Sequence, residues 1–225
     1  MAGKTNQRTK VAKCRVLIVD DHPIVRRGLV QLISQEPGLE VCGEAGDPTE
    51  ALRQVKLHCP DLMLVDLSLQ GGHGIELIEQ VRLLGVGSRM LVFSMHDELL
   101  FAERALRAGA MGYLQKHEPA ERLLEAIREV AGGNMYLSTA MSARLLHTVV
   151  SGQSLSHDPI EHLSNRELQV FEMIGDGLAT KKIAVKLHLS RKTIEAHREK
   201  IKAKLGLSNS AELNRRAVQW TLERR

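Results

Sequence analysis

Short apolar runs alternate with longer amphipathic segments along the first part of the chain. Runs rich in Val, Ile and Leu occupy residues 15–21, 39–45, 61–67, 89–95 and 111–116. Between them, apolar residues recur at three- and four-residue intervals over 23–35, 48–58, 75–84, 97–108 and 119–131, which is the period of an amphipathic helix. Strands that alternate with helices predict a parallel sheet whose two faces are both covered. The pattern therefore predicts a doubly wound α/β domain with a five-stranded parallel sheet.

The alternation ends near residue 132, and the rest of the chain has only helical patterns. A short helix is expected at 140–150, and a segment rich in Gly, Ser, Asp and Pro at about 150–161 is typical of a linker. The sequence Ser164-Asn-Arg-Glu167 is a capping box that opens a helix through about residue 175.

Three more helices follow that one. A second is expected at about 180–187, His188 and Leu189 turn the chain, and Ser190 caps a third helix that Gly206 ends. Ser208 is expected to open the fourth. Two helices separated by a tight turn predict a helix-turn-helix within an all-α, four-helix domain.

Polar residues stand where the predicted strands of the first domain end. Asp20 and Asp21 end the first strand, Asp66 the third and Ser94 the fourth, and Lys116 follows the fifth. Each alone could be a helix cap or a surface charge, but carboxyl ends of parallel strands share one crevice. Three carboxylates in one crevice repel each other and favour a hard cation, which we expect to be Mg²⁺ or Mn²⁺.

Charge divides the chain into three parts. Residues 1–13 carry four Lys or Arg and no acid, residues 14–161 carry 13 basic and 20 acidic residues, and residues 162–225 carry 14 basic and 7 acidic ones. An acidic first domain suits cation binding, and a small basic domain suits a phosphate backbone.

Composition excludes several protein classes. No run approaches the roughly 18 apolar residues that cross a bilayer, and the polar, basic start is not a secretory signal. The three cysteines are odd in number, lack C-x-x-C spacing and are expected to be reduced core thiols. We therefore expect a cytoplasmic protein without a membrane partner.

The strand-end residues resemble those of the receiver domain of two-component response regulators, and this resemblance implies a flavodoxin-like fold. The likeness covers about residues 14–132 and rests on Asp20-Asp21, Asp66, Ser94, Tyr113 and Lys116. It implies that a sensor histidine kinase phosphorylates Asp66, with Ser94 and Lys116 contacting the phosphoryl group. It also implies Mg²⁺ held by Asp21, Asp66, the Leu67 carbonyl and, through water, Asp20, and a switch formed by Ser94 and Tyr113.

One position departs from the receiver pattern. The family usually has proline four residues after the phosphoacceptor, whereas this chain has Gln70 followed by Gly71 and Gly72. We expect a looser loop there, because glycine and glutamine restrict the backbone less than proline. The rate or lifetime of phosphorylation is the property that this change would affect.

The second part resembles the LuxR-type DNA-binding domain of the NarL/FixJ regulators. The likeness covers 160–225, leaves 133–159 as linker, and rests on L163-S-N-R-E167, I183-A184, L189-S190, T193-I-E-A-H197 and K204-L-G-L207. By position in the motif, the residues expected to face the bases are Glu195, Ala196 and Glu199. Those expected nearer the phosphates are Thr180, Arg191, Lys192, Thr193, Arg198 and Lys202.

One such domain covers a single half-site, so we expect a homodimer on double-stranded DNA once the protein is phosphorylated or DNA-bound. Leu213, Ala217 and Trp220 of the fourth helix form either the dimer interface or intradomain packing. RNA polymerase is a further expected partner.

The favoured hypothesis is a transcription factor switched by phosphorylation, not an enzyme acting on other molecules. Asp66 would serve a hydrolase as a nucleophile, but the chain has no G-x-S-x-G elbow and no histidine placed as a base. A third hypothesis is a DNA-binding protein that works without phosphorylation, in which the Gln70 loop has lost signalling.

Overall fold

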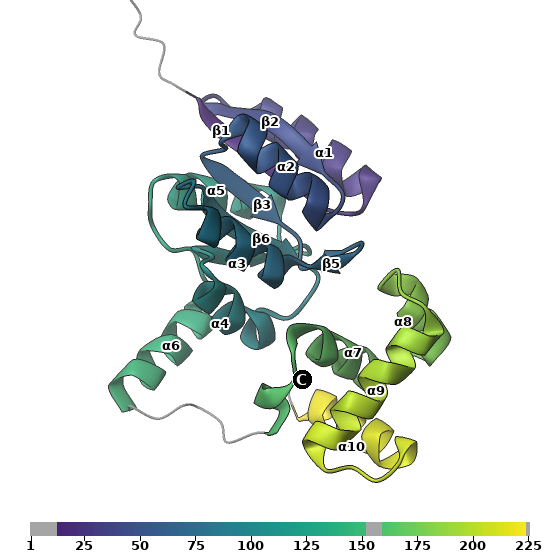
Figure 1. Cartoon of the computed structure of the whole chain (residues 1–225). Coiled ribbons are helices and arrows are strands. Elements are labelled where there is room, and N and C mark those ends of the chain that lie inside the picture. Colours follow the sequence, from purple (N-terminus) through teal and green to yellow (C-terminus); the bar gives the residue numbers. More distant parts are fainter. Residues whose placement is uncertain (1–12, 152–158, 224–225) are drawn as a thin grey trace, which may run out of the picture.

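The first domain is built on a five-stranded parallel sheet with strand order β2-β1-β3-β6-β7 (Figure 1). In this computed structural model the described residues are 13–151 and 159–223, so residues 152–158 of the predicted linker and most of the basic start lie outside them. The strands are β1 (Cys14–Val19), β2 (Leu39–Ala45), β3 (Leu62–Val65), β6 (Arg89–Ser94) and β7 (Gly112–Gln115). β1 and β3 pair from Val16 with Leu62 to Val19 with Val65, which brings their carboxyl ends level.

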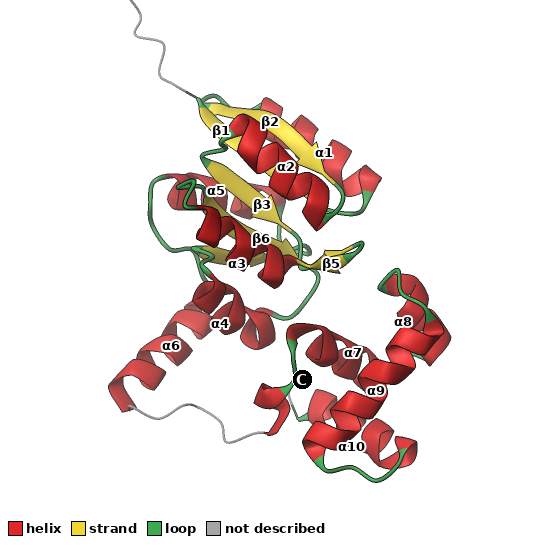
Figure 2. Ribbon diagram, viewed as in Figure 1, coloured by secondary structure: helices red, strands yellow, loops and turns green. Residues whose placement is uncertain are grey.

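Helices cover both faces of the sheet (Figure 2). One face packs on α1 and α5 through residues such as Ile33 and Ile127, and the other on α2, α3 and α4 through residues such as Val55, Ile78 and Phe101. The helices are α1 (Pro23–Ser34), α2 (Pro48–His58), α3 (Gly74–Leu84), α4 (Glu98–Ala108) and α5 (Ala120–Ala131). The predicted doubly wound fold is confirmed.

The segment after Asp66 differs from its prediction. In place of a loose loop, β4 (Ser68–Leu69) and β5 (Gly72–His73) form a two-stranded antiparallel hairpin. Gly71 adopts φ 81°, a left-handed conformation that suits glycine in a tight turn. Glycine here makes the turn possible instead of loosening the loop.

The chain after α5 stays attached to the first domain. Tyr136 forms a parallel bridge with Gly112 and so extends the sheet edge at β7. Helix α6 (Thr139–Ser151), expected at 140–150, then packs against α4. The 3₁₀ turn η1 (Pro159–His162) leads into the second domain.

The second domain consists of α-helices in its described part. They are α7 (Asn165–Gly175), α8 (Thr180–Lys186), α9 (Arg191–Leu205) and α10 (Ser210–Leu222). Ser164 and Glu167 make both hydrogen bonds of the predicted capping box, and Ser190 caps α9 as expected. The fourth helix is capped by Asn209 instead of opening at Ser208, because the Asn209 side chain accepts the hydrogen bond of Glu212 N–H.

The apolar stripe of α10 serves the domain's own core. Leu213, Ala217 and Trp220 are buried, and the Trp220 ring lies 5.3 Å from that of Phe171 in α7. Of the two roles considered for this stripe, packing within the domain is the correct one, and a dimer interface through these residues is wrong. The apolar side chains that α10 exposes are Val218 and Leu222.

Two expectations from composition can be compared with the structure. All three cysteines are free, but Cys59 is exposed at the end of α2, so its assignment to the core is wrong. None of the helices in the described ranges is long and apolar enough to cross a membrane.

Candidate functional site

Three carboxylates and one ammonium meet at the carboxyl ends of β1, β3 and β7. Asp20 and Asp66 are almost fully buried, with 2% and 3% of their surface exposed. The Lys116 ammonium lies 2.6 Å from Asp20 Oδ2 and 2.6 Å from Asp66 Oδ2, so it donates hydrogen bonds to both. The sheet therefore brings together four of the residues that the sequence assigned to one crevice.

Burial and charge act in opposite directions at this cluster. Burial alone would lower the pKa of Lys116, but the carboxylates of Asp66 and Asp20 raise it above its ordinary value. Burial also raises the pKa of Asp21, against the influence of His22 and with a further increase from Asp66. Lys116 thus neutralises the carboxylates of Asp20 and Asp66, here called the inner carboxylates, but not that of Asp21.

The carboxylates fit a divalent cation. Asp20, Asp21, His22 and Asp66 each offer a ligand atom, and these atoms lie within 4.8 Å of one another. Asp21 Oδ1 is buried without a hydrogen-bond partner, although His22 Nδ1 lies 2.7 Å away, because the imidazole is not oriented to donate to it. An orphaned carboxylate oxygen beside two others is the oxygen donor set that Mg²⁺ prefers.

The Leu67 carbonyl, expected as a further ligand, already accepts a hydrogen bond from Gly74 N–H at 2.9 Å. Gly74 begins α3 against this backbone: a Cβ at position 74 would stand 2.2 Å from the Asp66 carbonyl oxygen. Glycine is therefore needed at position 74, because the helix approaches the backbone of Asp66 so closely.

The two expected switch residues are both buried and share one neighbour. Ser94 Oγ accepts a hydrogen bond from His96 N–H at 3.5 Å, and the Tyr113 hydroxyl donates to the His96 carbonyl at 3.0 Å. Burial raises the pKa of Tyr113 well above its ordinary value, so the hydroxyl remains a donor. The Tyr113 side chain thus points into the domain. The contacts that His96 makes with both residues were not predicted from the sequence.

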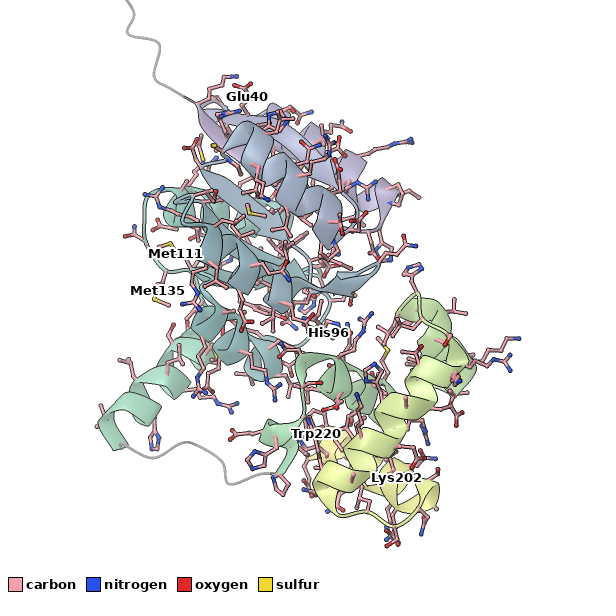
Figure 3. The ribbon with its side chains drawn as sticks, in the orientation of Figure 1. Glu40, His96, Met111, Met135, Lys202 and Trp220 are labelled. Atoms are coloured by element: carbon pink, nitrogen blue, oxygen red, sulfur yellow. The ribbon has the colours of Figure 1, made fainter. Side chains whose placement is uncertain are left out.

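The residues expected to contact DNA lie on α8 and α9. Arg191, Lys192, Glu195, Ala196 and Glu199 are exposed, and Thr180, Thr193, Arg198 and Lys202 are partly exposed. Some have partners within the domain: Arg198 donates to Asn214 Oδ1 at 3.0 Å, and Lys202 lies 2.9 Å from Glu199. Lys202 is labelled in Figure 3, on the side of the helical domain remote from the sheet.

The acid cluster opens into a cavity between the two domains. This cavity of about 280 Å³ is lined on one side by residues of the sheet domain, including Asp66, Ser68, His96 and Lys116, and on the other by Glu172, Met173, Asp176, Leu178 and Lys186. Figure 3 shows His96 at the junction between the sheet domain and α7. The carboxylate cluster and the helical domain therefore share one space.

Further contacts cross the same junction. Arg104 of α4 donates to the carbonyls of Leu163 and Glu161 and to Asn165 Oδ1, at 2.7, 3.1 and 3.3 Å. His188, in the turn between α8 and α9, lies 3.4 Å from Asp21 Oδ2. Sequence reasoning did not predict these contacts, because Arg104 and His188 are ordinary polar residues until the domains meet.

Two family models match the chain, one over each domain. The response regulator receiver domain matches residues 16–128, and the luxR family of bacterial regulatory proteins matches residues 161–217. The chain belongs to the LuxR-type response regulators. This is a family of DNA-binding transcription regulators with a phosphorylatable receiver and not of catalytic enzymes.

Three relatives cover between 62% and 94% of this response regulator. It is 34% identical over 216 residues to the oxygen regulatory protein NreC of Staphylococcus carnosus, covering 94% of this chain and 98% of that one. A LuxR-family response regulator from Aurantimonas is 37% identical with a TM-score of 0.57, covering 62% of this chain and 99% of that one. RcsB of Salmonella typhimurium is 25% identical with a TM-score of 0.63, covering 92% and 98%.

Proposed function

We propose that a sensor histidine kinase transfers a phosphoryl group to Asp66 in a Mg²⁺-dependent reaction, and that this controls dimerisation, DNA binding and transcription. The observation that carries the proposal is the carboxylate cluster itself, in which Lys116 donates to Asp20 and Asp66 while Asp21 Oδ1 accepts no hydrogen bond. A buried, partly neutralised carboxylate beside an orphaned oxygen is suited to accept both a cation and a phosphoryl group.

Each residue of the cluster has a role in this proposal. Asp20, Asp21 and Asp66 would hold Mg²⁺, which, when bound, neutralises charge and orients the phosphoryl group. Lys116 would contact the phosphoryl oxygens, and the Ser94 hydroxyl would donate a further hydrogen bond. Leu67 has less support than the carboxylates because Gly74 already occupies its carbonyl.

Tyr113 would report the state of Asp66 through His96. Its hydroxyl is bonded to the His96 carbonyl, and the His96 N–H is bonded to Ser94, so a movement of Ser94 reaches Tyr113 within one residue. The proposed switch therefore has a physical connection between hydroxyl and aromatic ring.

For DNA, we propose that α9 enters the major groove with Glu195, Ala196 and Glu199 toward the bases. Thr180, Arg191, Lys192, Thr193, Arg198 and Lys202 would contact phosphates. A relative supports dimerisation, since RcsB dimers are seen bound to two parallel DNAs. Because its proposed target is DNA, we propose that the protein acts in the cytoplasm. RNA polymerase is a further proposed partner.

The test compares the wild type with Asp66→Asn. Both are treated with Mg²⁺ and acetyl phosphate, and dimerisation is measured by sedimentation. DNA binding is measured at fixed salt, because the phosphate contribution depends strongly on salt. The probe is a duplex that the phosphorylated wild type selects from a random-sequence pool.

We expect wild type alone to dimerise and bind the duplex more tightly after treatment. Equal binding by both proteins would contradict the proposal and would favour a DNA-binding protein independent of phosphorylation. Failure of the wild type to take up phosphate would remove its first step.

A further inference from the structure

Two residues connect the phosphoacceptor pocket with the DNA-binding domain. Ser68 and His96 each stand two residues after a pocket residue, Asp66 and Ser94. Through their backbones they contact the pocket: Ser68 N–H lies 3.3 Å from Asp66 Oδ1, and His96 N–H lies 3.5 Å from Ser94 Oγ. Their backbone positions therefore depend on the state of the pocket.

The side chains of the same two residues are held by α7. Gln169 Nε2 lies 2.7 Å from Ser68 Oγ and 2.7 Å from His96 Nε2. Glu172 Oε2 lies 2.7 Å from His96 Nδ1 on the opposite side of the imidazole. Gln169 is fully buried and His96 is 7% exposed, so water does not compete freely for these hydrogen bonds.

The orientation of the Gln169 amide is fixed from within its own domain. Arg166 donates to Gln169 Oε1 at 2.6 Å, so the amide oxygen faces Arg166 and the NH₂ group faces the receiver. The two amide hydrogens then donate to Ser68 Oγ and His96 Nε2, and His96 donates from Nδ1 to Glu172. The Ser68 hydroxyl lies 3.0 Å from the same His96 Nε2, so this hydroxyl and the Gln169 amide both face one ring nitrogen.

We propose that Gln169, from the DNA-binding domain, restrains Ser68 and His96 and thereby slows phosphoryl transfer to Asp66. This inference rests on the proposed function. In the reaction with acetyl phosphate, an Asp66 carboxylate oxygen bonds to phosphorus, the bond from phosphorus to the acetyl oxygen breaks, and acetate leaves with the electron pair.

The new phosphoryl group needs the segments 66–68 and 94–96 to adjust around it. Ser94 must give up its contact with His96 N–H to reach a phosphoryl oxygen, while α7 holds the His96 ring in place. Gln169 therefore stabilises the arrangement that precedes phosphorylation, and its removal should speed phosphorylation. Two hydrogen bonds of ordinary net strength correspond to about a tenfold change in rate.

The experiment measures the rate constant of Asp66 phosphorylation in the full chain with acetyl phosphate and Mg²⁺. Gln169→Ala and Gln169→Met are compared with wild type. Methionine has about the length of glutamine but has no N–H or O–H to donate to Ser68 and His96. A restraint through these hydrogen bonds predicts that both variants gain about tenfold, based on the loss of the same two hydrogen bonds, whereas a packing role predicts that only Ala differs.

Two controls separate this restraint from general loosening of the domains. Gln219→Met makes the same substitution at an exposed position of α10 and is expected to leave the rate unchanged. Arg104→Ala removes three interdomain contacts, none of them to Ser68 or His96, and should raise the rate less than Gln169→Ala does. Small-angle X-ray scattering reports domain separation for each variant.

An equal or larger rate for Arg104→Ala than for Gln169→Ala, or a wild-type rate for Gln169→Met, would overturn the inference. In either case Asp66 is still phosphorylated, and the proposed function stands. If wild type itself fails to be phosphorylated while remaining folded, the proposed function fails instead, so the two failures are distinguishable.

Discussion

Lys116 should be essential to the stability of the receiver, because it is the cation that contacts both inner carboxylates. Its side chain is 7% exposed, and its ammonium lies 2.6 Å from oxygens of Asp20 and Asp66. In Lys116→Met a similar length of chain remains but the charge is lost. Removing one partner from a buried ion pair costs about 3 to 5 kcal/mol, since the other charge is left uncompensated.

We expect the lower end of that range, because the cluster borders a cavity that water can enter. A loss of about 3 kcal/mol corresponds to a melting temperature roughly 6 to 12 °C lower for a chain of this size. Mg²⁺ should recover much of the loss. At about a hundred times its dissociation constant, a ligand of the folded state stabilises by about 2.7 kcal/mol. The variant should bind Mg²⁺ more tightly because no ammonium competes for the carboxylates.

The assay is thermal and urea unfolding of wild type and variant, with and without Mg²⁺. Lys56→Met, at an exposed position near the end of α2, is the matched control for loss of one positive charge. If Lys116→Met and Lys56→Met are equally stable, or if Mg²⁺ stabilises wild type as much as Lys116→Met, the reasoning about the cluster is refuted.

Three further predictions concern the fold. Gly74→Ala should cost about 3 kcal/mol in urea unfolding, since overpacking against backbone is costly and the new Cβ would stand 2.2 Å from the Asp66 carbonyl oxygen. Trp220→Ala should lower the free energy of unfolding by about 3 to 5 kcal/mol, because it leaves a cavity beside Phe171. A loss smaller than that of a typical Ile→Val substitution would contradict this prediction. Burial lowers the pKa of His73, so the free energy of unfolding should fall as pH drops below about 6.5, where the unfolded chain takes up the proton. The pH slope measured for His73→Asn should be shallower than that of wild type, and an unchanged slope would show that His73 does not contribute.

Most of the first domain could be predicted from the sequence, because apolar residues recur at different spacings in its strands and in its helices. Continuous apolar runs and three- and four-residue spacing lead to the observed elements with ends that shift by a residue or two. The site followed from one topological rule, that polar residues at the ends of parallel strands share a crevice. That rule alone predicts that Asp20, Asp66 and Lys116 lie close together.

The hairpin after Asp66 could not be predicted in the same way. Strands of two residues, Ser68–Leu69 and Gly72–His73, are too short to show an alternating pattern. Glycines at 71 and 72 are equally typical of a mobile loop and of a tight turn. Only the pairing of Ser68 with His73 and of Leu69 with Gly72 decides between them.

The junction between the domains was hidden for a different reason. Gln169 and Glu172 occupy polar positions of an amphipathic helix, where solvent exposure is the ordinary expectation. Their burial depends on another domain, which contributes Ser68 and His96 from more than seventy residues away. No local sequence pattern predicts such a contact, since the contact depends on how the two domains are placed relative to each other.

Helix α7 connects the two activities because its two faces serve different domains. Phe171 faces inward, packs against Trp220 and is fully buried, so α7 cannot move without disturbing the core of the DNA-binding domain. Gln169 and Glu172 face the receiver and hold His96, whose backbone contacts both Ser94 and Tyr113. A change at Asp66 that releases His96 therefore acts on a helix that is already part of the DNA-binding core. The receiver can influence DNA binding through this contact without any signal passing along the linker.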